Sequence, residues 1–289
     1  MEWIDGMNKA MDYIEEHLEN EITADELSRI AMCSAFHFQR MFAYITGVTL
    51  TEYIRRRRMS CALFDLVNGM KVIEVSLKYG YDSPTAFTRA FRQTHGIAPS
   101  EVRRRGSTLN TFPKITFTFS VKGEQAMNCR IIKKEAFRVV GFRNSMPMTM
   151  ENCFELMPQV WKEFHENNGA ERLSAIMRDN EPRGILALSL CENGEYAGCI
   201  IGTATDADVP EGMKEYIVPE TTYAVFECVG ALPEAMQTVQ ERIISEWLPV
   251  SGYEYAPSPD FEVYPSGDQN SPDYRSEVWL PIVRPSANG

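Results

Sequence analysis

Two segments of this chain are near copies of each other, 49 residues apart. Residues 34–57 read SAFHFQRMFAYITGVTLTEYIRRR, and residues 83–105 read SPTAFTRAFRQTHGIAPSEVRRR. In each copy a serine precedes two phenylalanines at helical spacing, and an arginine lies between those phenylalanines on another face. A repeat of this length indicates a duplicated supersecondary unit. We therefore expect two short helices, one displaying Arg40 and the other displaying Arg89.

A second short helix and a tight turn precede each copy. Residues 23–26 (TADE) match a capping box that opens a helix over 24–31. The corresponding helix of the second copy is expected over 72–79, and the chain restarts at Ser83 with Pro84 at the favoured first helical position. Helix, turn and arginine-bearing helix predict two helix-turn-helix units, which can address successive major grooves of DNA.

Two further helices complete this segment. Apolar residues recur at helical spacing from Ile4 to Leu18, which predicts a supporting helix before the first unit. A second capping box at residues 49–52 opens a helix that runs to the stop signal Asn68 and Gly69 and joins the two units.

Charge is distributed unevenly along the chain. Residues 27–106 carry 13 Lys and Arg against 5 Asp and Glu, whereas residues 107–289 carry 15 against 26. A basic segment in a chain of net charge −11 is typical of a protein that binds a polyanion. We expect the acidic remainder to stay off nucleic acid.

Residues 1–106, and above all HFQRMF (37–42) and SPTAFTRAF (83–91), resemble the DNA-binding domain of the AraC/XylS family. The resemblance implies a bacterial transcription regulator, for which we expect double-stranded DNA and RNA polymerase as partners. The candidate DNA contacts lie on the two arginine-bearing helices and the basic helix ends: Phe36, His37, Gln39, Arg40, Thr85, Thr88, Arg89, Arg55, Arg56 and Arg104. For the arginine clusters the alternative is a solvated face or internal ion pairs that hold the fold.

The boundary between two domains is expected after Gly106. Residues 107–126 read as a linker, with a short alternating strand over 115–121. A strand, helix, strand, strand pattern then occurs twice: 130–143, 153–167, 185–191 and 198–205, followed by 214–229, 233–248, 261–264 and 277–283. The expected fold class is therefore multidomain, with an all-α double helix-turn-helix domain at 1–106 and an α+β domain of tandem βαββ modules at 127–289.

Residues 135–142 (EAFRVVGF), the tryptophan-bearing helix and residues 277–283 (EVWLPIV) resemble the GyrI-like domain, an effector-binding module of multidrug-responsive regulators. The resemblance implies that Glu277 lies at the bottom of an aromatic pocket that recognises a small cationic, lipophilic ligand. Strand alternation independently places Glu277 beside Trp279, and a carboxylate under aromatic rings favours an apolar cation. The alternative is an edge-strand glutamate in water. Further expected wall residues are Trp161, Phe142, Tyr196 and Tyr223, although a helical stripe such as the one containing Trp161 is also typical of a core.

Other function classes find less support in the sequence. No apolar run approaches a membrane span and no signal peptide is evident, so we expect a cytoplasmic chain that binds no membrane. The four histidines lack metal-ligand spacing, and we expect no metal, no cofactor and no catalytic residue. Two alternatives stay open. One is a GyrI-like small-molecule hydrolase or drug-sequestering protein with an attached DNA-binding domain, in which Glu277 acts with Tyr196 or Tyr223. The other is a regulator whose C-terminal domain binds another protein.

Overall fold

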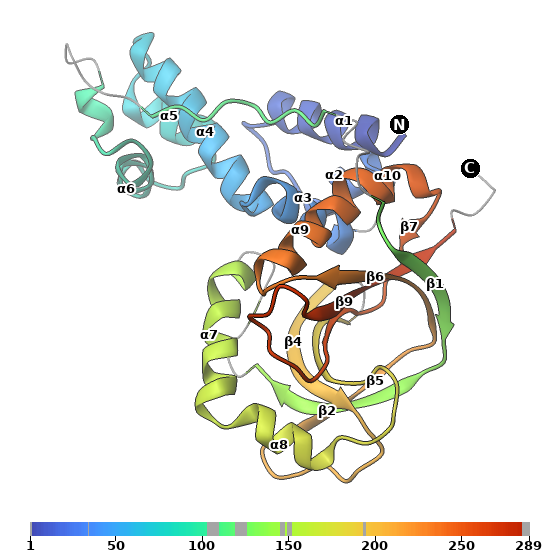
Figure 1. Cartoon of the computed structure of the whole chain (residues 1–289). Helices are drawn as coiled ribbons and strands as arrows, with labels where there is room; N and C mark the ends of the chain where they lie inside the picture. Colours follow the sequence, from blue (N-terminus) through green and yellow to red (C-terminus); the bar gives the residue numbers. More distant parts are fainter. Residues whose placement is uncertain are drawn as a thin grey trace. The chain divides into compact units, whose positions relative to one another are not determined.

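The computed structural model describes residues 2–33, 35–102, 110–118, 126–144, 148, 152–192 and 195–284 (Figure 1). Contacts between Cα atoms divide the chain into two units. The first comprises Met1–Met32 and Thr46–Thr118, and the second comprises Cys33–Ile45 and Phe119–Gly289. The second helix-turn-helix therefore lies wholly in the first unit. The arginine-bearing helix of the first helix-turn-helix is grouped by its contacts with the C-terminal residues.

The first unit is helical. Its elements are α1 (Glu2–Glu16), α2 (Ala24–Ile30), α4 (Leu50–Val67), α5 (Val72–Lys78), α6 (Pro84–His95) and the 3-10 turn η1 (Pro99–Glu101). These helices match the positions that the capping and periodicity signals predict. None of the helices in the described ranges is long and apolar enough to cross a membrane.

Local signals explain where these helices begin and end. The Thr23 hydroxyl accepts from the Glu26 amide, and the Glu26 carboxylate accepts in return from the Thr23 amide, which completes the capping box. At α6, the Ser83 hydroxyl accepts from the amide of Ala86. Gly96 ends that helix in the left-handed conformation, with φ 77°.

The core of the second helix-turn-helix is built on the repeated phenylalanines. Phe87 and Phe91 are fully buried and pack with Leu63 of α4 and with Val75 and Tyr79 at the end of α5. Burial of this apolar face fixes which side of α6 remains exposed.

The strand expected over 115–121 is not present in its described part. Residues 115–118 are irregular, and residues 119–121 lie outside the described ranges. The Asn8 side chain exchanges two 2.8 Å hydrogen bonds with the backbone of Phe117, and the amide of Ile115 donates to the Tyr53 hydroxyl. Side chains of the helical unit therefore take the backbone groups that a neighbouring strand would have taken.

The C-terminal residues form one antiparallel sheet. Its strands are β1 (Cys129–Lys134), β2 (Phe137–Arg143), β3 (Ile185–Glu192), β4 (Glu195–Ala204), β5 (Lys214–Val218), β6 (Thr221–Val229), β7 (Glu254–Tyr255), β8 (Asp260–Tyr264) and β9 (Arg275–Val283). The order is β1-β6-β9-β8-β3-β4-β2-β5, with β7 paired to β9. The strands curve around a common interior, and helices α7 and α8 lie outside the curve (Figure 1).

The expected α+β architecture of two similar modules is confirmed, with differences in detail. The strands expected over 130–143 and 214–229 are each two strands, separated at residues 135–136 and at Pro219 and Glu220. The modules also exchange their first strands, since β1 pairs with β6 and β5 pairs with β2. Pairing across modules depends on contacts distant in the sequence, which a periodicity argument does not detect.

The helices of the second unit cover one face of the sheet. They are α3 (Ala35–Thr46), α7 (Cys153–Glu166), α8 (Gly169–Ile176), α9 (Glu234–Arg242), the π-helical turn η2 (Ile243–Trp247) and α10 (Leu248–Ser251). The apolar core under α7 and α8 includes Val140, Ile201 and Phe164. The other face of the sheet has a separate core, with Val139, Ile200 and Trp279 among its members. The sheet therefore has two buried faces.

Candidate nucleic-acid interface and effector site

The exposed face of α6 carries the polar residues expected to contact DNA. A shallow hollow along this face is lined by Pro84, Thr85, Thr88, Arg89, Arg92 and Gln93. Arg89 and Arg92 are exposed, and their helix is oriented by the buried Phe87 and Phe91. The Thr88 hydroxyl donates to the Pro84 carbonyl at 2.7 Å, which leaves its methyl group for an apolar contact. This surface has the composition of a helix that enters a major groove.

The corresponding helix α3 differs from the expectation. Arg40 and His37 are only 8% and 3% exposed, whereas Gln39 is half-buried. The Arg40 guanidinium forms an ion pair with the Asp260 carboxylate, and both side chains are almost buried. The side chain of Phe36 lies outside the described side chains. In this structure α3 therefore does not display its arginine.

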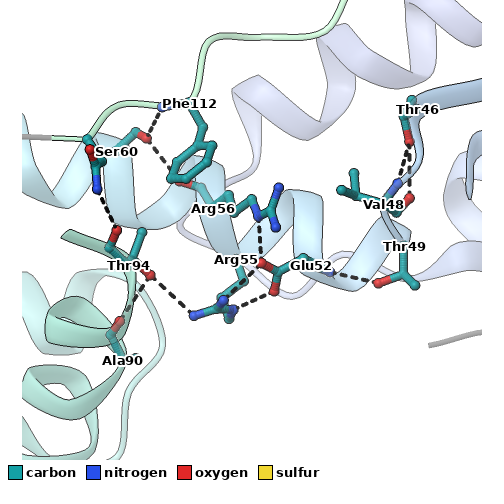
Figure 2. A network of polar contacts seen from close by, with 11 residues as sticks. Thr46, Val48, Thr49, Glu52, Arg55, Arg56, Ser60, Ala90, Thr94 and Phe112 are labelled. Carbon is teal, nitrogen blue, oxygen red and sulfur yellow. Dashed lines mark hydrogen bonds and ion pairs between the residues drawn. The ribbon is translucent and has the colours of Figure 1, made fainter. Parts of the chain in front are cut away.

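The basic end of α4 is an internally paired network (Figure 2). Arg55 donates to both carboxylate oxygens of Glu52, at 2.7 and 2.9 Å, and Arg56 donates to one of them at 2.5 Å. Arg55 also reaches the Thr94 hydroxyl on α6 at 3.3 Å. Burial alone would raise the pKa of Glu52, but the hydrogen bonds from Arg55 and Arg56 lower it. These contacts fit the alternative in which the arginines hold the helices together.

The next two arginines of α4 are also engaged. Arg57 pairs with Glu15 at 2.6 Å, and Arg58 donates to the carbonyls of Leu18 and Asn20. Three of the four arginines over 55–58 therefore take part in an ion pair with a glutamate. Arg104 lies outside the described residues.

A group of acidic and aromatic residues lies on the helix-covered face of the sheet. Alternation along β8 turns Phe261 and Val263 into the other core and leaves Asp260, Glu262 and Tyr264 on this face. The Glu262 carboxylate accepts from the Tyr264 hydroxyl and from Gln240 of α9, both at 2.5 Å.

Aromatic rings surround these carboxylates. Trp161 of α7 contacts the Tyr264 ring edge-on, with centroids 5.4 Å apart. Tyr255 of β7 contributes a further ring, since its hydroxyl is buried and lies in the field of Asp260. We refer to Asp260, Glu262, Tyr255, Tyr264 and Trp161 as the acid–aromatic cluster.

Burial dominates the electrostatics of this cluster. It raises the pKa of Asp260, and the Arg40 charge acts in the opposite direction. Burial also raises the pKa of Glu262, against the hydrogen bonds from Tyr264 and Gln240. A desolvated carboxylate is stabilised as an anion only by a nearby cation or by several donors. In chemical terms, such an arrangement can accept a cation beside its carboxylates.

Both carboxylate oxygens of Glu277 accept hydrogen bonds in this structure. Its Oε1 accepts from Arg130 of β1 at 2.7 Å, and its Oε2 accepts from the Trp279 indole at 2.8 Å. The side chain is 24% exposed, and Trp279 belongs to the core on the face opposite α7. Alternation correctly placed Glu277 beside Trp279, but it could not show that β1 brings an arginine to the same carboxylate.

The other expected wall residues divide between the two faces. Trp161 belongs to the acid–aromatic cluster, and the pKa of Tyr196 is raised by burial and influenced by Arg40 and Asp260, which places it nearby. Phe142 packs under α7 and α8, with its ring 5.8 Å from that of Phe164. Tyr223 lies in the opposite core and donates to the Pro259 carbonyl. Tyr223 and Trp279 therefore do not join the cluster.

Reasoning from the sequence missed Asp260, Glu262, Tyr255 and Tyr264. A signal was present in DFEVY (260–264), where two acids and a tyrosine alternate with apolar residues in an expected strand. Polar residues at that period face one side of a sheet. The decisive information is that helices cover this side, which makes the polar residues buried rather than solvated. Within the described part of the chain, no group of His, Cys, Asp and Glu could hold a metal ion.

Two family models match two separate segments of the chain. A helix-turn-helix domain family matches residues 27–105, and the family of integron-associated effector binding proteins matches residues 130–282. The Tn10 TetD protein of Escherichia coli is 38% identical over 93 residues, which are 32% of this chain and 67% of that protein. The transcriptional activator AarP of Providencia stuartii is 36% identical over 98 residues, covering 34% and 73%. The solved structure of SAV2435 bound to tetraphenylphosphonium covers 54% of this chain and 94% of its own, with 21% identity and a TM-score of 0.49.

Helix-turn-helix motifs joined to an effector-binding domain define a DNA-binding transcription regulator. The chain belongs to the AraC-type family of transcription regulators and carries a C-terminal domain of the integron-associated, GyrI-like effector-binding family.

Proposed function

We propose that this regulator binds a small cationic, amphipathic effector at the acid–aromatic cluster and couples that binding to its reading of double-stranded DNA. The proposed protein partner is RNA polymerase, through which a promoter-bound regulator acts. The proposal places the chain in the cytoplasm, where the chromosome is accessible. In the domain organisation that we propose, residues 1–106 bind DNA, residues 107–126 connect, and residues 127–289 bind the effector.

The observation that carries the proposal is the ion pair between Asp260 and a guanidinium inside an aromatic cluster. Asp260 and Glu262 are two carboxylates on one strand face, and desolvation disfavours their charge. Of the two Asp260 carboxylate oxygens, Oδ2 is the one that pairs with the Arg40 guanidinium. Aromatic faces beside carboxylates attract a cation that is also apolar.

A titration with tetraphenylphosphonium tests the effector class, because this ion combines one positive charge with a large apolar surface. Triphenylphosphine oxide serves as the neutral analogue. Glu262→Gln keeps the shape of the side chain and removes its charge, and Glu277→Gln is the matched control in the same sheet. We expect Glu262→Gln to cost the cation about 2–5 kcal/mol of binding free energy and the neutral analogue much less. We expect Glu277→Gln to have little effect on either ligand.

Two results would contradict the proposal. Equal affinity for the cation and the neutral analogue in wild type, Glu262→Gln and Glu277→Gln would mean that the charge of the ligand is not recognised. Loss of cation binding in Glu277→Gln, with Glu262→Gln unchanged, would return the site to Glu277 and the face of Trp279. The titrations are repeated in an Arg40→Ala background. In that background the guanidinium that pairs with Asp260 cannot compete with a weakly binding ligand.

A hydrolase is the second candidate, favoured by the 2.5 Å hydrogen bond between the Tyr264 hydroxyl and Glu262. A carboxylate of raised pKa beside a phenol could act as a general base on a bound electrophile. The pairs considered from the sequence, Glu277 with Tyr196 or Tyr223, are replaced in this proposal by Glu262 and Tyr264. Chromatography of the ligand after incubation decides, since a regulator returns it unchanged and a hydrolase releases product that is lost in Glu262→Gln.

A further inference from the structure

The arginine in the acid–aromatic cluster comes from the first DNA-reading helix. Arg40 Nη2 donates to Asp260, and the same nitrogen donates to the Tyr44 hydroxyl at 3.2 Å. The guanidinium also lies over the Tyr44 ring, 5.1 Å from its centroid. One turn earlier on α3, the His37 ring is 4.4 Å from the ring of Tyr255. Helix α3 thus supplies one cation and two rings to the site.

This arrangement has the features of a bound cationic ligand. The charge of Arg40 is matched by Asp260, its flat face is covered by an aromatic ring, and 10% of its side chain is exposed. A buried ion pair is costly to break when one partner is left without a replacement. Arg40 can therefore leave Asp260 readily only if another cation takes its place or the carboxylate loses its charge.

The same guanidinium is the candidate base reader of the first helix-turn-helix. It cannot contact Asp260 and a base edge at the same time. Arg89 holds the equivalent position in the second copy and is exposed on α6. Because Arg89 is exposed and Arg40 is paired with Asp260, the second helix-turn-helix can contact DNA bases through its arginine and the first cannot.

We propose that Arg40 is an internal ligand of the effector site, and that a cationic effector displaces it from Asp260 and thereby releases α3 to read the first half of the DNA site. This inference rests on the proposed function and adds the regulation of the same site. Without effector the chain specifies one half-site through α6. With effector it specifies two half-sites, about one helical turn or 10 base pairs apart.

Competition at the site gives the first test, with full-length protein and tetraphenylphosphonium as the probe. A ligand that must displace an internal group has an apparent affinity reduced by the fraction of open sites. If Arg40 fills the site in 90–99% of molecules, Arg40→Ala should strengthen tetraphenylphosphonium binding by about 10- to 100-fold. Arg183→Ala is the control, because Arg183 carries the same charge in the same unit, is exposed, and pairs only with Asp179 and Glu181 among the described residues. Unchanged affinity in Arg40→Ala overturns the inference.

Selection of DNA from a random-sequence pool gives a second test that needs no effector. Asp260→Asn removes the partner of Arg40 while keeping the size of the side chain, so α3 should be released. We expect wild type to enrich one half-site, and Asp260→Asn to enrich two. Wild type with saturating tetraphenylphosphonium should match Asp260→Asn. Enrichment of both half-sites by effector-free wild type overturns the inference, as does enrichment of a single one by Asp260→Asn that remains folded by circular dichroism.

The two tests separate the inference from the proposed function. If tetraphenylphosphonium binds no variant, including Arg40→Ala, the proposed effector class fails, and the DNA selection alone decides whether Arg40 is withheld. If tetraphenylphosphonium binds, the effect of DNA on its affinity gives the final check. An effector that raises affinity for the two-half-site DNA by a given factor must itself be bound more tightly on that DNA by the same factor. Absence of that reciprocal gain overturns the coupling.

Discussion

Arg40 and Arg89 occupy equivalent positions of a repeated motif, yet Arg40 is 8% exposed and paired with Asp260 whereas Arg89 is exposed on α6. The two helices have the same capping serine position, the same phenylalanine spacing and the same arginine in the sequence. The difference arises from the surroundings. Within the second unit, the acidic strand β8 lies beside α3 and pairs Asp260 with Arg40, whereas the described neighbours of α6 leave its polar face open.

This asymmetry leads to unequal effects of two matched substitutions on DNA binding. Arg89→Ala should weaken specific binding by about 1–3 kcal/mol in the absence of effector and relax the base preference in one half-site. Arg40→Ala should cost much less without effector, because its guanidinium is already engaged, and should cost a similar amount to Arg89→Ala once the effector is present. Competition binding with specific and random duplexes measures both. An equal loss on random DNA would identify the arginine as a phosphate contact.

The limits of sequence reasoning are clear from these helices. Capping boxes, glycine stops and apolar periodicity act within about one turn, so they located α2, α4, α5 and α6 closely. These signals show which face of a helix is polar. They do not show which other element packs against that face. Arg40 therefore looked like Arg89 in the sequence and differs from it in the structure.

The site that we propose for the effector could be predicted only in part from the sequence, for a similar reason. Trp161 was found because a tryptophan on an amphipathic helix is conspicuous, and Glu277 was chosen because its motif resembled a family pattern. Deciding between Glu277 and Glu262 needs the strand order, since β1 brings Arg130 to Glu277 while α9 brings Gln240 to Glu262. These neighbours are more than 20 residues distant in the chain. Local pattern cannot supply them.

The paired arginines of α4 give a second prediction. Arg55 has two hydrogen bonds to Glu52 and one to Thr94 (Figure 2), so Arg55→Gln should lower the melting temperature by about 1–3 °C. The side chains are about a third exposed, and solvent screening keeps the effect small.

The salt dependence of DNA binding separates this structural role from phosphate contact. Each phosphate contact that is lost reduces the log–log slope of affinity against salt by about 0.9. We expect Arg104→Gln to show that reduction with an unchanged melting temperature, and Arg55→Gln to lower the melting temperature with the slope nearly unchanged. If Arg55→Gln instead lowers the slope by a full unit, Arg55 contacts phosphate in spite of its pairing with Glu52.

The final prediction concerns pH and His37. Burial, followed by the neighbouring Arg40 charge, lowers the pKa of His37 to about 3, so the ring is neutral while α3 lies against Tyr255. When α3 is released, the imidazole should titrate near its ordinary value of about 6.5. The released state then binds more protons, and the free energy that holds α3 in place is complete above about pH 6.5. It should fall by about 1.4 kcal/mol for each pH unit below that value, down to the lowered pKa.

Hydrogen exchange of the α3 amides at pH 7.5 and 5.5, corrected for the intrinsic rates, measures this release. Asp260 and Glu262 face the same site, and their raised pKa values give proton uptake of their own over the acidic range. Comparison with His37→Gln removes these contributions, because both carboxylates remain in the variant. Wild type should lose about tenfold more protection than His37→Gln between pH 7.5 and 5.5, which is the population change expected when one proton binds the released imidazole with a pKa of about 6.5. Identical pH dependence in the two proteins would mean that His37 stays accessible to protons in the closed state and does not contribute to holding α3.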